Sequence, residues 1–259
     1  VNGLDTSPYH LVLLCENQTG YQNLIKMVSR SYTEGFYFKP RIDRDLLREH
    51  SEGIIALSAC LAGEIPRALS QNDYQKAKEA AQFYLDVFGK DHYFIELQNH
   101  GIRQQQKILP DLIRLAKELD VGLVATNDCH YLTKEDSMTQ KILLCIQTNH
   151  TLEEDNGMGF ETEEFYVKSR QQMFDAMREC TGDEEAIRQA LDNTVKIAER
   201  CQVEFTFGHH ILPKFEVPDG RDNVTFFREK CWEGFAKRYG EDAPQEYKER
   251  LEYELSVIE

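Results

Sequence analysis

The sequence predicts an α/β fold of mostly parallel strands, and three observations support this prediction. Four short apolar runs have the length and continuity of buried strands. Segments with helical periodicity separate these runs, so strand and helix alternate along the chain. Hydrophobic residues make up 41% and charged residues 29% of the 259 residues, which is ordinary for a globular protein. Such alternation occurs both in closed barrels and in open sheets.

The predicted strands are short apolar segments bounded by polar or turn-forming residues. They are 9–15, 53–58, 93–97 and 121–126, with a shorter fifth strand expected at 203–207. A strand that is buried on both faces is apolar throughout instead of alternating. The four main segments therefore favour parallel pairing, with helices covering the sheet.

Helices are expected between these strands, at 17–32, 43–47, 73–89 and 104–119. Asp73 is a suitable N-cap for the third of them, and Gly89 is expected to end it. Pro110 lies inside the fourth. Because proline lacks a backbone N–H and its ring clashes with the preceding turn, a kink or break is expected there.

The second half of the chain is predicted to be mainly helical. Thr133 and Asp136 have the spacing of a capping box, which opens a helix running to about residue 146. Residues 153–159 are expected to form a loop. Ser169 and Asp183 are expected to open two further helices.

The composition changes after Pro213, where 213–220 forms a linker that contains proline and glycine. Two charged helices follow, at 223–239 and 245–259. We therefore divide the sequence into domains at 1–214 and 215–259. The chain begins at Val1 without a methionine and its last helix lacks a C-cap, so we expect it to be part of a longer protein.

Charge and cysteine content restrict the class of protein. A net charge of −15 argues against a surface that binds nucleic acid everywhere, because phosphate binding needs clustered Lys and Arg. One small basic cluster occurs at 39–44, and such clusters are mostly solvated surface. Seven widely spaced cysteines without a CxxC motif indicate reduced thiols in a cytoplasmic protein. The sequence has no membrane-length apolar run and no signal peptide. A glycine-rich phosphate loop, GxSxG and HExxH are also missing from it.

Candidate functional residues follow the predicted strands, because parallel α/β folds place their sites beyond the carboxyl ends of the strands. This rule selects Cys60, residues 98–100, and Asp128 with His130. Residues i and i+2 of an extended segment point to the same side, so Asp128 and His130 can converge on one metal ion. In the alternative, Asp128 caps the next helix and His130 packs beneath it.

For four residues, the sequence also allows a purely structural role or leaves the surroundings of the side chain open. Cys60 can be a small buried hydrophobic residue, and His10 can be a hydrogen-bonded core histidine. Glu96 alternates with apolar neighbours and is expected to point inward, where a carboxylate needs a partner or a cation. His100 lies in a polar loop, where most histidines are solvated.

Several longer motifs identify a family. They are GYQNL (20–24), YTEGFYFKPRID (32–43), LSACLAGEIP (57–66), ATNDCHY (125–131), LCIQT (144–148), NTVKIAERC (193–201) and LPKF (212–215). In this order they resemble the N-terminal PHP (polymerase and histidinol phosphatase) domain of bacterial replicative DNA polymerase III alpha subunits. The resemblance covers nearly the whole chain.

The resemblance implies a distorted PHP-type barrel with surrounding helices, incomplete at its N-terminus here, and a helical extension at the C-terminus. It implies a metal cluster at the carboxyl ends of the strands. The family's later metal ligands map onto His10, Cys60, Asp128 and His130. Its earlier ligands, which include a His-x-His pair, would lie upstream of Val1.

Glu96 and His100 are then expected to lie next to these ligands, on the side away from the metal. Mixed His, Cys and Asp donors favour zinc, with manganese or iron as alternatives. In family members that keep the metals, the cluster is associated with phosphate-ester hydrolysis, including 3′→5′ exonuclease activity. Magnesium is expected at the polymerase centre of the parent protein.

The resemblance also implies partners. They are the remainder of the alpha subunit, DNA and nucleotides, a separate proofreading exonuclease subunit and the sliding clamp. No association with a membrane is expected. The polymerase aspartates belong to a downstream palm domain, and 215–259 resembles only its helical entry. We therefore expect no polymerisation by this chain alone.

Two alternative functions stay open. One is a non-catalytic PHP domain that serves as an interaction platform for the proofreading exonuclease. The other is a free-standing PHP phosphatase acting on a small ester such as histidinol phosphate, although the terminal helices and the long motifs argue against it.

Overall fold

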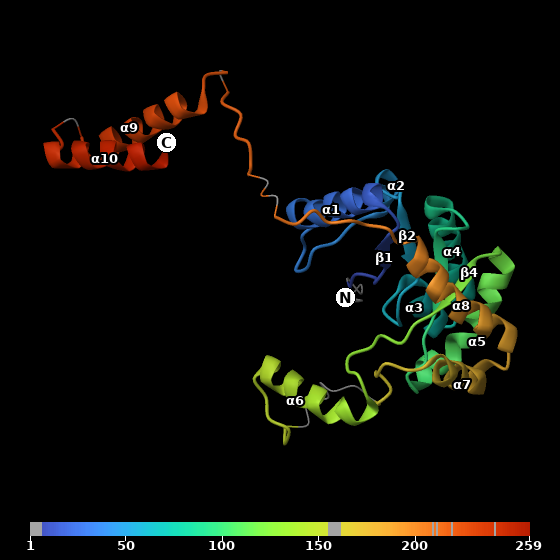
Figure 1. Ribbon diagram of the computed structural model, residues 1–259. Helices are drawn as coiled ribbons and strands as arrows, with labels where there is room; N and C mark the ends of the chain where they lie inside the picture. The colour runs from blue at the N-terminus through green and yellow to red at the C-terminus, as the bar shows by residue number, and fades with distance from the viewer. Residues whose placement is uncertain (1–6, 155–161, 209, 211, 219, 241) are drawn as a thin grey trace, which may run out of the picture. The chain divides into compact units, whose positions relative to one another are not determined.

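The computed structural model describes residues 7–154, 162–208, 210, 212–218, 220–240 and 242–259 (Figure 1). The chain divides into two compact units, Val1–Glu204 and Phe205–Glu259, and each is described by itself below. The division into domains at residue 214 stays a prediction. Residues 155–159 of the expected loop lie outside the described residues.

The first unit is built on a four-stranded sheet. Its strands are β1 (Val12–Cys15), β2 (Ile54–Leu57), β3 (Tyr93–Leu97) and β4 (Gly122–Ala125), in the spatial order β1-β2-β3-β4. The pairs β2–β3 and β3–β4 are parallel, whereas β1 runs antiparallel to β2. The predicted α/β class is confirmed. Over the described residues the sheet is open, so the closed barrel stays a prediction.

Helices fill the intervals between and after these strands. They are α1 (Gln18–Thr33), α2 (Arg44–Glu49), α3 (Glu64–Ser70), α4 (Tyr74–Phe88), α5 (Arg103–Leu119), α6 (Ser137–Thr148), α7 (Arg170–Thr181) and α8 (Glu184–Arg200). The predicted cap at Asp73 is confirmed, since its carboxylate accepts a hydrogen bond from the Lys76 backbone N–H, and Gly89 is the C-cap of the same helix. Thr133 and Asp136 do form a capping box, but it opens a 3₁₀ turn (Lys134–Asp136) that leads into α6.

Of the kink or break expected at Pro110, the break does not occur, because α5 continues through Pro110 as one helix, and the kink stays a prediction. Pro110 lies on the exposed side of α5. Other positions of this helix bury Leu109, Leu112 and Ile113 in the core. Burying such side chains is worth about 1.5–3 kcal/mol each, which together exceeds the roughly 3 kcal/mol that an interior proline costs.

Alternate residues of the strands pack on the two faces of the sheet. Ile54 and Ala56 face a large core that includes residues of α4, α5 and α7. Ile55 and Leu57 face a smaller cluster that includes Ile197 of α8. Since helices cover both faces, the β2 and β3 strands are buried along their whole length, as their apolar sequences predicted.

The expected strand at 203–207 was wrong, since these residues are not in a strand. Val203, Phe205 and Phe207 alternate with polar residues, which is the pattern of a half-buried strand. Phe207 is 90% exposed. Alternation alone cannot make a strand, because a strand needs a neighbouring edge to satisfy its backbone hydrogen bonds.

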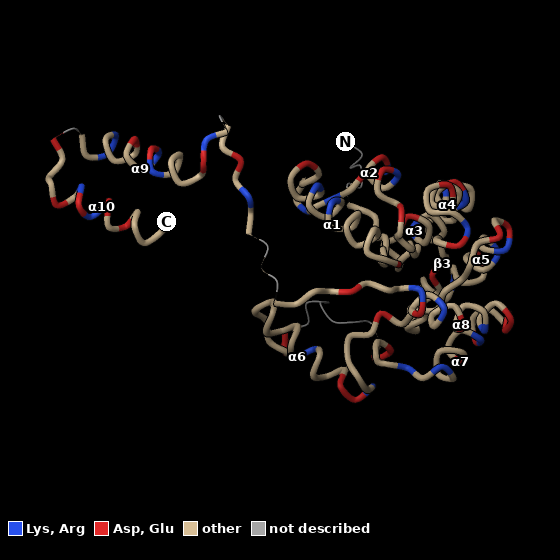
Figure 2. Tube along the Cα trace, turned by 45° about the horizontal axis from the view of Figure 1, so that its top comes forward, with Lys and Arg blue, Asp and Glu red and all other residues tan. Residues whose placement is uncertain are grey.

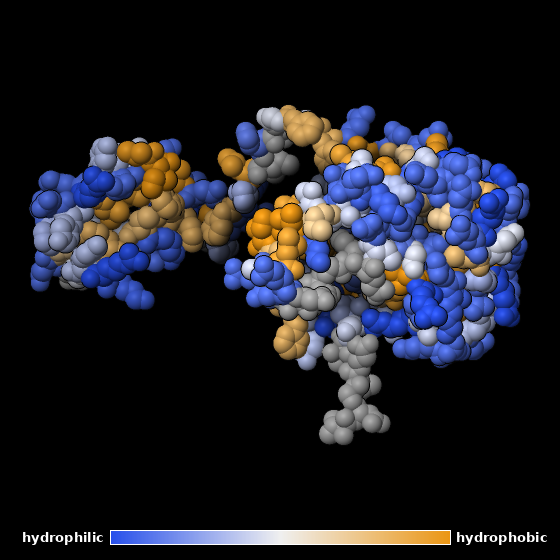
Figure 3. Space-filling model, turned by 90° about the horizontal axis from the view of Figure 1, so that it is seen from below, coloured by the Kyte–Doolittle hydropathy of each residue, from blue (hydrophilic) through white to orange (hydrophobic). Residues whose placement is uncertain are grey.

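The second unit contains α9 (Asn223–Tyr239) and α10 (Gln245–Ile258). Hydrophobic side chains gather along this pair of helices between hydrophilic margins (Figure 3). Buried apolar residues described here are few: Phe235, Ala243 and Leu255. No helix among the described residues of either unit is long and apolar enough to cross a membrane.

Candidate functional site

The candidate site lies where β2, β3 and β4 end. These strands are parallel neighbours, so the residues that follow each of them meet at one edge of the sheet. This edge receives residues 58–63 from β2, 98–100 from β3 and 126–130 from β4. The predicted site residues other than His10 and Glu96 belong to these three segments.

His10 and Cys60 lie side by side at this edge, with His10 Nδ1 3.6 Å from Cys60 Sγ. The residues before β1 reach this position because β1 is antiparallel to β2, so its beginning lies beside the end of β2. The His10 backbone N–H donates to the Ala62 carbonyl at 3.0 Å and pairs this residue with Gly63. His10 is exposed and Cys60 is half-buried, so neither is the core residue that the structural alternatives described.

The distance between His10 and Cys60 fits a shared metal ion. Zinc binds histidine nitrogen at about 2.0–2.1 Å and cysteine sulfur at about 2.3 Å, so two such ligands at a tetrahedral angle are roughly 3.6 Å apart. The observed separation is also within reach of a weak hydrogen bond to sulfur. Both donors are ones that zinc prefers.

Glu96 holds the turn that carries Cys60. Its Oε2 accepts a hydrogen bond of 3.0 Å from the Ala59 backbone N–H, and its own N–H donates to Ser58 Oγ at 2.9 Å. Ala59 has a φ of +64°, an unfavourable conformation for a residue with a side chain. A conformation of this kind persists only where its surroundings impose it. The sequence predicted that the Glu96 side chain points inward. The backbone N–H of Ala59 is one of the hydrogen-bond partners that a buried carboxylate needs.

Burial is the main influence on the Glu96 carboxyl, which is 4% exposed, and it raises the pKa of this group. Hydrogen bonds from Thr126, Gln98 and the Ala59 N–H lower the pKa but do not cancel the effect of burial. The negative charge of Asp128 raises the pKa of Glu96 further. Asp128 is thus within electrostatic range of the residue that supports Cys60.

The Asp128–His130 segment is exposed and its backbone departs from the expected geometry. Asp128 has a φ of +41°, so the segment is not extended there and the simple i, i+2 argument does not apply. His130 Nδ1 lies 2.7 Å from the Asp128 carbonyl oxygen. The His130 backbone N–H donates to the Phe165 carbonyl at 2.8 Å. An imidazole that is oriented by a backbone carbonyl is typical of metal-binding histidines.

His100 is buried, at 1% exposure, so the expectation of a solvated loop histidine was wrong. Its Nε2 lies 2.9 Å from the Asn127 carbonyl oxygen and its ring stacks on Phe165 at 4.2 Å between centroids. Burial lowers the pKa of His100, and the nearby charge of Asp128 opposes that shift. His100 therefore braces the residue that precedes Asp128.

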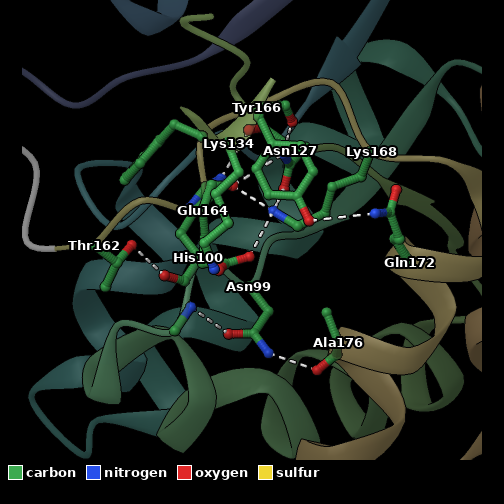
Figure 4. Close-up of polar contacts among 12 residues, drawn as sticks. Asn99, His100, Asn127, Lys134, Thr162, Glu164, Tyr166, Lys168, Gln172 and Ala176 are labelled. Carbon is green, nitrogen blue, oxygen red and sulfur yellow. Dashed lines mark hydrogen bonds and ion pairs between the residues drawn. The ribbon is translucent and has the colours of Figure 1, made fainter. Parts of the chain in front are cut away.

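A segment that sequence reasoning missed holds the 127–130 loop in place (Figure 4). The side-chain amide of Asn127 donates to the carbonyls of Glu164 at 3.1 Å and Tyr166 at 2.6 Å. The ammonium group of Lys168 contacts Asn127 Oδ1 at 3.4 Å and Glu164 Oε2 at 3.1 Å, and it lies 4.2 Å from the Tyr166 ring centroid. The one sequence signal was the Glu–Lys pair four residues apart.

Lys168 is unusual because its side chain is only 2% exposed. Burial lowers the pKa of Lys168, although Glu164 opposes the shift. Buried lysines are rare unless paired. The Glu164–Lys168 pair therefore indicates a structural clamp on the residues that follow β4.

The structure brings some of the predicted site residues together. That all four predicted ligands bind one metal cluster stays a prediction. His10 meets Cys60, and Asp128 acts electrostatically on Glu96 and His100. A small pocket is lined by Cys60, Glu96, Gln98 and Gln105, among others. Within the described part of the chain, no three or more His, Cys, Asp or Glu side chains form a group that could hold a metal ion.

Comparison with known proteins agrees with the resemblance found in the sequence. Residues 2–100 match the family described as the PHP domain. The chain is 43% identical over 241 residues to the DNA polymerase III subunit alpha of Thermus aquaticus, covering 92% of this chain and 19% of that protein. It is 41% identical over 251 residues to that of Treponema pallidum, covering 96% and 21%.

The same subunit of Mycobacterium tuberculosis is 36% identical over 252 residues, which cover 96% of this chain and 21% of the relative. The chain thus spans about a fifth of the length of these curated relatives. Residues 2–100 are thus similar to the PHP domain, and more than nine tenths of this chain is similar to DNA polymerase III alpha subunits.

Proposed function

We propose that this chain is the PHP-domain region of a bacterial replicative DNA polymerase alpha subunit and serves in DNA replication. The sequence identity to alpha subunits along nearly the whole chain supports this proposal. The four described strands would form one arc of a distorted PHP-type barrel, and the residues from 215 onward would lead into the palm. Its partners would be the rest of the alpha subunit, DNA, the proofreading exonuclease and the sliding clamp.

The PHP domain would hold divalent metal through His10, Cys60, Asp128 and His130. The observation that carries this assignment is the 3.6 Å separation of His10 Nδ1 from Cys60 Sγ, which matches two ligands of one zinc ion. Bound zinc, or manganese or iron in its place, would activate water for phosphoester hydrolysis of the 3′→5′ exonuclease type.

The residues around these ligands would position them. Glu96 holds the Ala59 turn and thereby sets the direction of Cys60. The Asp128 carbonyl orients the His130 ring through Nδ1. His100 and Lys168 support Asn127, the residue before Asp128.

Zinc titration by isothermal calorimetry tests the assignment. We expect the 259-residue chain to bind zinc, and we expect Cys60→Ser and His130→Ala each to weaken binding by about tenfold or more, because each removes a ligand. The hydrolysis of a single-stranded oligonucleotide with added Mn²⁺ should fall in parallel if the site is catalytic.

Cys129→Ser is the matched control, because Cys129 is an exposed thiol between the two candidate ligands and its Sγ contacts the Tyr166 carbonyl instead. Its zinc affinity should equal that of the unmodified chain. Equal losses in Cys60→Ser and Cys129→Ser, or no loss in either, would refute the ligand assignment. The domain would then be an interaction platform.

A further inference from the structure

The last turn of α1 and the loop that follows it expose four aromatic side chains within seven residues. Tyr32 is 60% exposed, Phe36 58%, Tyr37 56% and Phe38 81%. Large aromatic side chains are normally at least partly buried, because each buries 150–250 Å² of surface at a clear gain in free energy. Four such residues together on a surface indicate a contact with another molecule.

The conformation of this loop is held by its own contacts. Tyr37 pairs with Lys39 through a backbone hydrogen bond of 3.1 Å, and the residue between them, Phe38, has a φ of +58°. Gly35 is required beneath the loop, because a Cβ there would lie 2.1 Å from the Arg41 carbonyl oxygen. The loop thus imposes an unfavourable backbone conformation on Phe38 while leaving its ring in solvent. Strain of this kind concentrates at functional sites.

The rings are arranged as pairs. Tyr32 and Phe36 stack with their centroids 6.4 Å apart and an interplanar angle of 29°. Tyr37 and Phe38 meet edge to face at 4.7 Å. The guanidinium of Arg41 lies 5.2 Å from the Tyr37 centroid.

Positive charge accompanies the rings. Lys39 is exposed and Arg41 is half-buried. The neighbouring carboxylates have other roles: Glu34 is paired with Arg30, and Asp43 accepts a hydrogen bond from the Leu46 N–H as the N-cap of α2. Acidic and basic residues are interspersed along the chain (Figure 2), and the net charge of the whole sequence is −15. The loop is therefore a local combination of aromatic and basic groups on an acidic protein.

We propose that the aromatic loop, residues 32–41, binds single-stranded nucleic acid. Exposed rings offer stacking surfaces for unpaired bases, and the exposed Lys39 offers positive charge to the phosphates. Base stacking needs no sequence preference, which suits a loop without amides or carboxylates directed at base edges. A duplex keeps its bases stacked on one another and cannot use the rings in this way.

Fluorescence anisotropy of a labelled oligothymidylate tests the proposal on the 259-residue chain in EDTA. EDTA removes metal, so binding is measured separately from the proposed hydrolysis and either can fail alone. Phe38→Ala is expected to weaken binding roughly 5- to 150-fold, which corresponds to the range of base–aromatic stacking. Phe38→Trp should retain binding, because it keeps a stacking surface at the same backbone position. Lys39→Gln should weaken binding and reduce its salt dependence.

Tyr253→Ala is the matched control. Tyr253 in α10 is 59% exposed and has Arg250 5.3 Å from its ring centroid, so it resembles Tyr37 with Arg41 in exposure and charge. Its removal should leave binding unchanged, and all variants should keep the circular dichroism of the unmodified chain. No measurable oligothymidylate binding, or equal binding by Phe38→Ala and the unmodified chain, would overturn the proposal and leave the loop as a contact surface for protein.

Discussion

Glu96 shows how one buried carboxyl group organises the candidate site. It connects the end of β3 to the turn after β2 and accepts a hydrogen bond from Thr126 just after β4. A buried charge without such partners costs several kcal/mol. The raised pKa of Glu96 shows that its partners offset only part of the cost of burial.

We predict that Glu96 makes the stability of the chain depend on pH. Its pKa is raised in the fold above the ordinary 4.5, so its favourable contribution is full below pH 4.5 and is lost as pH rises through the raised pKa. In Glu96→Gln this loss should disappear, because glutamine does not titrate. Urea unfolding at a series of pH values should show the variant gaining stability relative to the unmodified chain across that window.

Glu16 supplies a control of opposite sign. Burial favours the neutral form of its carboxyl, but hydrogen bonds from His92 and Arg200 outweigh burial and lower its pKa. Its contribution is therefore present above pH 4.5 and lost as pH falls through the lowered pKa. Glu16→Gln should lose stability mainly at the higher pH values. The same pH trend in both variants would contradict the analysis.

At the scale of elements, several helices of the first unit begin at a side-chain N-cap, among them α4 and α8. Asp183, the N-cap of α8, accepts a hydrogen bond from the Ala186 N–H at 3.2 Å. It also forms an ion pair with Lys117 of α5 at 2.5 Å. The helix α8 covers β4 and supplies Asn193, whose amide donates to the Leu123 carbonyl at 2.7 Å. Its position therefore matters for the strand that leads to Asp128.

We predict that Asp183→Ala destabilises the chain by about 0.5–2 kcal/mol, because it removes a helix N-cap. Asp183→Asn should cost less, because asparagine keeps the cap and loses only an ion pair with a largely exposed lysine. Urea midpoints of the three proteins measure this order. If Asp183→Asn were as unstable as Asp183→Ala, the ion pair and not the cap would be the main contribution.

At the scale of the whole molecule, the two units differ greatly in the size of their cores. The described core of the first unit draws on the sheet and on seven of its helices. The second unit buries only three apolar side chains among its described residues. Small structures with little buried area are only marginally stable. The two units are therefore expected to unfold separately.

Trp232 makes this expectation measurable, because it is the one tryptophan of the sequence and lies in α9. Its fluorescence reports the second unit, whereas most of the helical circular dichroism comes from the first. We predict that the fluorescence transition occurs at a lower urea concentration than the main transition in circular dichroism.

Two variants separate the transitions. Phe235→Leu changes a residue whose ring centroid lies 5.3 Å from that of Trp232. This substitution should shift only the fluorescence transition. Ile187→Val in the first unit should shift only the later one, by the equivalent of about 0.5–1.5 kcal/mol. Coincident transitions in the unmodified chain would show that the units unfold as one.

Much of the first unit was predictable because its signals are local. Continuous apolar runs identified β2 and β3, and the caps at Asp73 and Asp183 identified where helices begin. The order of strands and helices gave the α/β class and, with it, the edge of the sheet where Cys60 and Asp128 lie. These features depend on residues that are close together in the chain.

The remainder depended on contacts between distant residues. The antiparallel direction of β1, which brings His10 to Cys60, is set by its pairing with β2 and leaves no trace in its own sequence. The burial of His100 and Lys168 follows from the way residues 162–168 pack against the 127–130 loop, some 37 residues away. The sequence by itself determined which segments form the sheet and which residue types reach its edge. Tertiary structure alone decided which of them meet, because distances between residues far apart in sequence are set by the packing of the whole unit.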